Sequence, residues 1–115
     1  MPVLATRDQE LVRAFRALFE LTHDELARVT GISVSTWERV ERGETERARA
    51  SRGIRGALET IEEIMTYLDR IPYGDLRRWA ARGSASRRSP IDLVHRVGGV
   101  GQLLQQLRAQ GDGVS

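Results

Sequence analysis

The chain has 115 residues, 40% of them hydrophobic and 30% charged, a balance typical of one soluble globular domain with room for a small helical addition. It contains no cysteine, which excludes disulfides, thiolate metal ligands and a cysteine nucleophile. The net charge is only +2, and all 18 basic residues are arginine, a usage that a GC-rich genome explains without any functional demand. The apolar runs are too short to span a membrane and the N-terminus lacks the layout of a signal peptide, so we expect a cytoplasmic protein.

The first predicted element is a helix that follows a capping box formed by Thr6 and Gln9. Its apolar stripe keeps helical spacing. The stripe consists of Leu11, Val12, Phe15, Leu18 and Phe19. No alternating pattern long enough for a strand occurs in the sequence, so the predicted fold class is all-α.

A second capping box, Thr22 with Glu25, begins a short helix that Gly31 ends. A third helix is predicted over residues 33–42, with Gly43 directly after it. A long fourth helix follows an Arg- and Glu-rich loop, because a second set of apolar residues keeps helical register. This set is Ile54, Leu58, Ile61, Met65 and Leu68.

Pro72 and Gly74 are expected to stop the fourth helix. A short fifth helix is expected around Leu76 and Trp79. Residues 81–89 are polar and small, and they form a predicted flexible loop.

Ser89, Pro90 and Asp92 then combine an N-cap, a proline in the first turn and an early acidic residue, which predicts a firm helix start. This helix is expected over residues 91–97.

Gly98 and Gly99 are expected to end that helix, before a last helix over residues 100–107 and a glycine-broken tail over residues 111–115. The two short helices have too few apolar residues for a core of their own. They must therefore dock against the fourth helix or against a partner.

Residues 21–43 meet the internal demands of two helices packed across a tight turn. Leu26 and Ala27 lie where the helices touch, and Gly31 lies at the turn. The residues expected to face the core after the turn are Ile32, Trp37 and Val40. The stretch resembles the lambda-repressor-like, Xre-type helix-turn-helix. The resemblance extends to the tripeptides Glu25-Leu26-Ala27, Gly31-Ile32-Ser33 and Glu41-Arg42-Gly43.

The resemblance implies that residues 1–70 form a DNA-binding domain whose second motif helix enters the major groove. The residues that it assigns to exposed, base-reading positions are Val34, Ser35, Thr36 and Arg39, with Ser33 at the start of the helix. Thr22 and His23 occupy positions where that family touches phosphate, with histidine in place of the usual glutamine.

Each of these residues also has an interpretation without DNA. Thr22 and Ser33 would cap helices in any protein, and Trp37 belongs to the core by its periodicity. We expect His23 to be a surface histidine, since His95 is the only other histidine and no metal-site spacing occurs. Glu38 and Glu41 are expected to be solvated or paired with Arg42.

The order of features after residue 70 resembles the C-terminal toxin-binding domain of Xre/MbcA/ParS-type antitoxins. These features are Trp79, the polar loop, the sequence SPIDLV over residues 89–94, the pair Gly98-Gly99, an apolar helix and a final Gly113-Val114. The segment between Trp79 and Pro90 departs from that family, because it is shorter and lacks the usual Pro-Asn and Leu-Gly pattern.

The resemblance implies that residues 71–115 bind a RES-domain toxin that acts on NAD. The chain would then be a type II antitoxin that also represses its own operon, as a homodimer on operator DNA. The residues assigned to the toxin are Trp79, Ser89, Pro90, Asp92, Gly111, Asp112, Gly113 and Val114. The tail over residues 111–115 is expected to reach toward the cleft of the toxin.

Two alternatives remain open. The C-terminal half could be only a dimerisation cap, in which case the chain is a stand-alone Xre-family regulator. The apolar stripe of the fourth helix could form the dimer seam or the core. An enzyme is not expected, because no converging titratable groups and no phosphate-binding glycine loop occur, and no cofactor or metal is expected.

Overall fold

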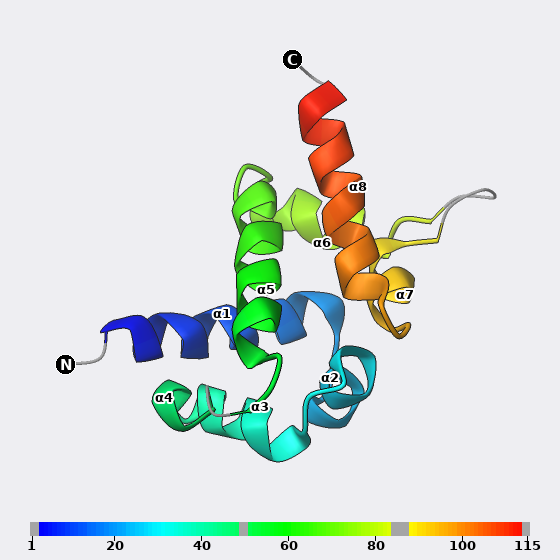
Figure 1. Ribbon diagram of the computed structural model, residues 1–115. Coiled ribbons are helices and arrows are strands. Elements are labelled where there is room, and N and C mark those ends of the chain that lie inside the picture. Colours follow the sequence, from blue (N-terminus) through cyan, green and yellow to red (C-terminus); the bar gives the residue numbers. More distant parts are fainter. Residues whose placement is uncertain (1–2, 49–50, 84–87, 114–115) are drawn as a thin grey trace.

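The computed structural model describes residues 3–48, 51–83 and 88–113, and every regular element in these ranges is an α-helix (Figure 1). The helices are α1 (Val3–Phe19), α2 (His23–Thr30), α3 (Val34–Glu41), α4 (Thr45–Ala48), α5 (Ile54–Leu68), α6 (Tyr73–Ala81), α7 (Pro90–Val94) and α8 (Gly99–Gly113). The predicted all-α class is confirmed.

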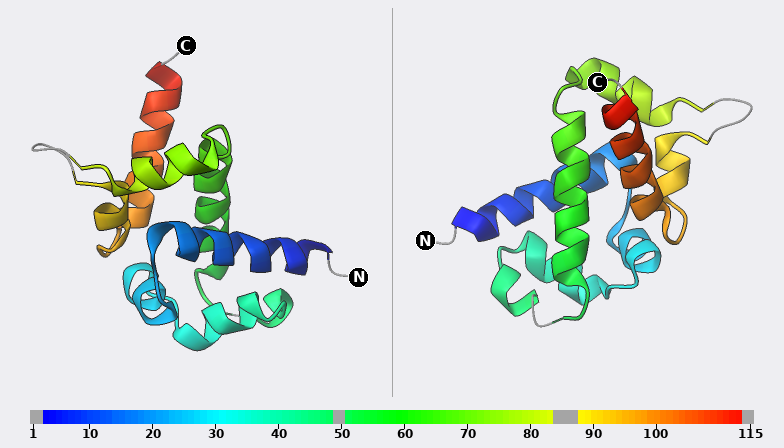
Figure 2. Two further views of the ribbon diagram at one scale, coloured as in Figure 1. Left: turned by 180° about the vertical axis from the view of Figure 1, so that it is seen from behind. Right: turned by 45° about the horizontal axis from the view of Figure 1, so that its top comes forward.

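The helix α5 stands at the centre of the molecule. It packs against α1 on one side and α8 on another, so it joins the two halves of the chain. The helices α3 and α4 lie at one end, α6 and the last turns of α8 lie toward the other end, and α7 and the start of α8 lie beside α2 (Figures 1 and 2).

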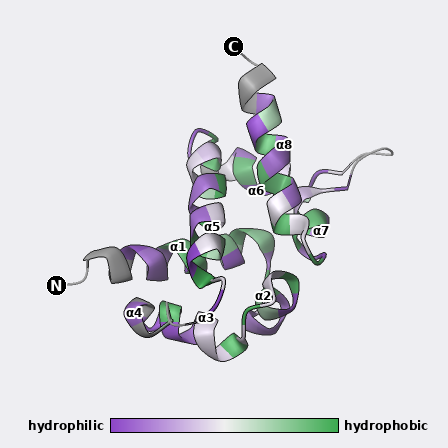
Figure 3. Cartoon of the chain, viewed as in Figure 1, coloured by the Kyte–Doolittle hydropathy of each residue, from purple (hydrophilic) through white to green (hydrophobic). Residues whose placement is uncertain are grey.

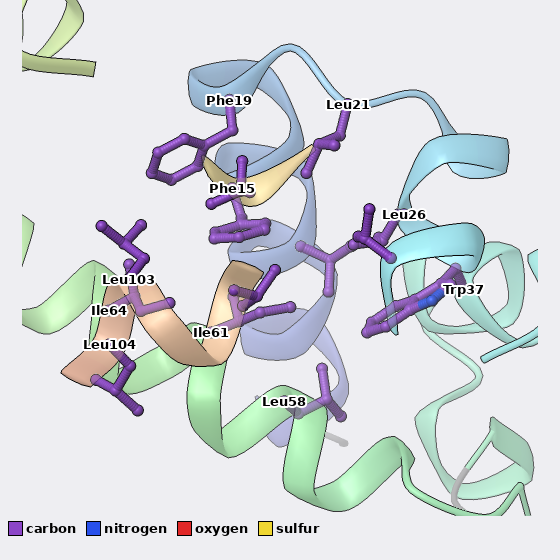
Figure 4. Close-up of a cluster of buried hydrophobic side chains, with 14 of the residues drawn as sticks. Phe15, Phe19, Leu21, Leu26, Trp37, Leu58, Ile61, Ile64, Leu103 and Leu104 are labelled. Carbon is purple, nitrogen blue, oxygen red and sulfur yellow. The ribbon is translucent and has the colours of Figure 1, made fainter. Parts of the chain in front are cut away.

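The interior is one hydrophobic cluster that takes side chains from α1, α3, α5 and α8 (Figure 4). Val12, Phe15 and Phe19 of α1 are completely buried, as their predicted stripe requires. The rings of Phe15 and Phe19 lie 4.9 Å apart, centroid to centroid. Leu103 and Leu104 of α8 reach the same interior, so the cluster continues across the predicted domain boundary at residue 70.

The C-terminal helices dock on the rest of the chain, as their low apolar content predicts, and α8 uses α5 for this purpose. Hydrophobic and hydrophilic residues alternate along α5 and α8 (Figure 3). Full burial of one large aliphatic side chain stabilises a fold by about 1.5–3 kcal/mol, so the few leucines of α8 are enough to hold it in place.

The apolar stripe of α5 belongs to this core. Ile54, Leu58, Ile61 and Leu68 are buried within the single chain, and Ile64 joins them without having been predicted. The suggestion that this stripe is the dimer seam is therefore wrong, because α1 and α8 already cover it.

The start of α1 differs from the prediction. The helix already includes Val3, so Thr6 lies inside it and the predicted capping box with Gln9 is wrong. The side-chain amide of Gln9 instead donates to the backbone carbonyl of Glu41 on α3. Gln9 therefore makes a contact with a distant helix in place of the predicted contact with Thr6.

The fourth helix ends at Leu68, before Pro72, as predicted. Two glycines that were expected to end helices lie in the first turn of the helices that follow. Gly74 belongs to α6, which begins directly after Pro72. Gly99 is the first residue of α8, and the turn before it is made by Gly98, whose φ is +78°. Glycine costs only about 1 kcal/mol in a helix, so a helix can include it.

The lengths of the last two helices also differ from the prediction. The helix α7 ends at Val94, three residues before its predicted end, whereas α8 continues to Gly113. Gly111, Asp112 and Gly113 therefore extend a helix, and the prediction that they form a glycine-broken tail is wrong. Val114 lies outside the described residues.

Candidate nucleic-acid interface

The turn between α2 and α3 forms as the sequence predicts. The Thr22 hydroxyl accepts from the backbone N–H of Glu25, and the Glu25 carboxylate accepts from the backbone N–H of Thr22. Gly31 ends α2 in the left-handed conformation with φ of +74°, where residues with a side chain are strained. Ser33 then caps α3 by accepting from the backbone N–H of Thr36.

A hydrogen bond across this turn engages the hydroxyl of Thr30. The indole N–H of the fully buried Trp37 donates to the Thr30 hydroxyl oxygen over 3.1 Å. The same hydroxyl donates to the carbonyl of Leu26 over 2.6 Å. A buried indole N–H needs a partner, so Thr30 lets Trp37 lie in the core without an unsatisfied donor.

The opposite face of α3 is open to solvent. Ser33 and Ser35 are exposed, and Val34 and Arg39 are partly exposed. In the part of the chain that the structure describes, the Arg39 guanidinium has no hydrogen-bond or ion-pair partner. The structure therefore leaves four of the predicted DNA-contacting residues accessible at least in part, and one of them is the cationic Arg39.

Thr36 does not share that surface. It is 2% exposed, and its hydroxyl lies 2.8 Å from the Ser33 hydroxyl and 2.8 Å from that of Ser51. The prediction of an exposed position is wrong because Thr36 lies beside Trp37, on the side of α3 that faces the chain before α5. Its hydrogen bonds connect the start of α3 to that segment.

The carboxylate of Glu41 is a buried hub at the end of α3. Its two oxygens accept from Arg16 Nε over 2.7 Å and from Arg16 Nη2 over 2.9 Å. His23 Nε2 lies 2.6 Å from Glu41 Oε2. The carboxylate side chain is only 8% exposed, so the prediction that Glu41 is solvated or paired with Arg42 is wrong. Arg42 pairs with Glu44 instead.

His23 contacts Glu41 and is not free for the predicted phosphate contact. Its Nε2 atom is engaged by the Glu41 carboxylate, so this nitrogen does not face outward to meet a phosphate. Of the two residues predicted at phosphate positions, only Thr22 is exposed. The sequence gives no local sign of this contact, because His23 and Glu41 lie on different helices.

Burial alone would raise the pKa of the Glu41 carboxyl. The hydrogen bonds and charges of Arg16 and His23 outweigh burial, so the pKa lies below its ordinary value. Glu41 therefore stays ionised near neutral pH. Its ion pair holds the end of α3 against α1 and the start of α2.

A second set of contacts fastens α2 to the C-terminal helices. The ring of His95, which follows α7, lies 3.0 Å from the Glu25 carboxylate through Nδ1 and 2.9 Å from the Phe19 carbonyl through Nε2. Arg28 donates to the backbone carbonyl of His95. The start of α2 is therefore held by α3 on one side and by the residue after α7 on the other.

The predicted toxin-binding residues are brought together only in part. Trp79 packs edge-on against Phe19, with ring centroids 6.4 Å apart, and it shares a pocket of about 260 Å³ with Pro90. Ser89 is buried and serves as the N-cap of α7, accepting from the backbone N–H of Asp92, which is itself exposed.

The remaining three described residues of that group, Gly111, Asp112 and Gly113, continue α8 beyond Gln110, which also lines the pocket. Among the described residues, no three His, Asp or Glu side chains gather closely enough to hold a metal ion. No helix in the same ranges is both long and apolar enough to cross a bilayer. Comparisons of the chain with protein-family models, curated proteins and solved structures found no match.

Proposed function

We propose that α2 and α3 form a lambda-repressor-like helix-turn-helix and that the chain binds operator DNA with the exposed face of α3. The observation that carries this proposal is the division of α3 into two faces. One face is fixed in the core by Trp37 and Glu41, and the other presents Ser33, Ser35 and Arg39 to solvent.

The chemistry of the open face suits a DNA groove. The major groove admits an α-helix, and an arginine guanidinium can donate two hydrogen bonds to a guanine edge or meet a phosphate. The hydroxyls of Ser33 and Ser35 can donate to or accept from either kind of group. Thr36 is not assigned to DNA in this proposal because it is buried. His23 is not assigned to DNA because its Nε2 atom contacts the Glu41 carboxylate.

Replacing Arg39 with alanine is expected to weaken operator binding by about 1–3 kcal/mol if the guanidinium reads a base. Loss of a phosphate contact would instead lower the magnitude of the slope of log K against log salt concentration by about one. Fluorescence anisotropy with DNA from upstream of the gene, at several salt concentrations, measures both. Arg70→Ala is the matched control, because Arg70 is exposed just beyond the far end of α5. Equal affinity of wild type and Arg39→Ala contradicts the proposed role.

We further propose that the C-terminal helices bind a partner protein. The supporting observation is that Trp79 and Pro90, which the antitoxin resemblance assigns to the partner, line one open pocket. Following that resemblance, the partner is a RES-domain toxin acting on NAD, and a pair of chains represses the operon. A dimer would have to use a surface other than the buried stripe of α5.

This second proposal predicts a separation of functions. A chain lacking residues 111–115 is expected to bind operator DNA normally but to protect less well against the co-encoded toxin, since the deletion shortens α8 beside the pocket. Arg39→Ala is expected to behave in the opposite way. Growth and cellular NAD during co-expression measure protection. If the full chain protects against no protein encoded beside it, the chain is a stand-alone regulator.

A further inference from the structure

The pocket that contains Trp79 is lined by apolar residues that are buried or partly buried and by polar residues that are exposed. We call the first group its floor, formed by Trp79, Pro90, Leu103 and Leu107, and the second group its rim. At about 260 Å³ the pocket is smaller than a typical small-molecule site, which spans roughly 300–1,000 Å³. Its size and lining fit one apolar side chain delivered by a larger molecule.

The rim carries two arginines whose positive charges are not paired with a carboxylate among the described residues. Arg82 and Arg88 both line the pocket and are exposed, and neither forms an ion pair within the ranges that the structure describes. Two other arginines are engaged by carboxylates. Arg78 pairs with Asp75 over 2.9 Å, and Arg108 of α8 is held by Glu63. The two rim arginines are therefore available to an acidic ligand.

Gln106 and Gln110 also line the pocket, and they lie one helical turn apart on α8. Their side-chain amides can pair with both the N–H and the C=O groups of a passing backbone.

We propose that this pocket receives one apolar side chain from an acidic segment of the partner protein, with carboxylates on either side of that anchor meeting Arg82 and Arg88. The inference rests on the proposed partner-binding function and names the chemistry that the partner must present. The apolar floor favours a protein segment over DNA. The helix α3, whose exposed face is the proposed DNA-binding surface, also lies away from α6 and the last turns of α8 (Figure 1).

The test begins with selection of peptides from a random displayed library on the full-length chain. We expect the enriched peptides to combine aspartate or glutamate with one leucine, isoleucine or phenylalanine. A synthetic peptide of the consensus sequence is then titrated by fluorescence anisotropy. Arg82→Glu/Arg88→Glu is expected to weaken its binding at least about tenfold, because rim charges of the wrong sign repel the ligand.

The matched control is Arg77→Glu/Arg96→Glu, which makes the same change of net charge at two exposed positions outside the pocket lining. It should change affinity by no more than about twofold, since charges exposed at a distance are screened. Circular dichroism checks that both variants fold. No enrichment, a consensus without acidic residues, or equal losses in the two variants would overturn the inference. The inference would also be overturned if the chain bound duplex DNA and this binding were lost in Arg82→Glu/Arg88→Glu but kept in the control variant.

Co-expression separates this inference from the function on which it rests. If wild type and Arg82→Glu/Arg88→Glu protect equally against the co-encoded toxin, partner binding stands and the assignment of the pocket falls. If the full-length chain protects against nothing, the antitoxin function falls, and the peptide titration alone decides whether the pocket takes acidic segments.

Discussion

Replacing Glu41 with alanine is expected to lower the free energy of unfolding by about 3 kcal/mol. This is the low end of the range for breaking a buried ion pair, because Arg16 and His23 keep partial access to water. The variant loses two hydrogen bonds from Arg16 and one contact with His23. Urea unfolding followed by circular dichroism measures the difference.

Glu38→Ala is the control, because it makes the same change on the same helix at a partly exposed position outside the hub. It should cost less than about 0.5 kcal/mol. Equal stability of the two variants would show that the hub contributes nothing.

The effect should also depend on pH. The pKa of Glu41 is lowered in the folded state, so its stabilising contribution is present above the unfolded-state pKa and is lost as pH falls through the folded-state pKa. The stability difference between wild type and Glu41→Ala should therefore shrink in acid. A difference that stays constant down to the most acidic pH at which both proteins fold would contradict the assignment.

The second large effect is expected at Gly99, where α8 crosses close to α7. An added Cβ would lie 1.7 Å from the carbonyl oxygen of Leu93 and 2.8 Å from its carbonyl carbon. Both atoms belong to the backbone, so no rotation of a side chain can relieve the overlap. Gly99→Ala should therefore destabilise the protein by about 3 kcal/mol, the upper part of the usual range for overpacking.

Gly101→Ala makes the same chemical change two residues later in α8, where an added Cβ would meet nothing within 4 Å. Alanine is the better helix former, so this variant should gain up to about 1 kcal/mol. Thermal unfolding of the two variants beside wild type tests the pair. Equal melting temperatures for all three proteins would contradict the close packing of α7 and α8.

The parts of this fold that could be predicted are those with local signals. The capping box of Thr22 and Glu25 and the turn at Gly31 depend on residues within a few positions of one another, and both form as predicted. The same holds for the start of α7, where Ser89 accepts from the backbone N–H of Asp92.

The parts that could not be predicted depend on contacts between distant residues. Burial of Glu41 requires Arg16 and His23, which lie on two other helices, and no spacing in the sequence indicates their meeting. Gly74 and Gly99 resemble helix stops locally, but they lie in the first turns of α6 and α8.

Within the candidate site, one missed contact did have a signal. Thr30 occupies a position where an apolar residue is usual, seven residues before Trp37, whose buried N–H needs an acceptor. A polar residue at such a position can therefore be understood as the partner of a nearby buried indole. The burial of Thr36 had a weaker signal, since it required knowing which side of α3 meets Ser51.

An NMR titration of the isotope-labelled chain with DNA from upstream of its gene tests directly whether the exposed face of α3 binds DNA. A duplex of the same composition in scrambled order serves as the control. If this face binds DNA, the largest amide shift changes should occur at Ser33, Val34, Ser35 and Arg39, with much smaller changes for the scrambled duplex. Changes concentrated on α6, α7 and α8, or equal responses to the two duplexes, would contradict DNA binding by this face.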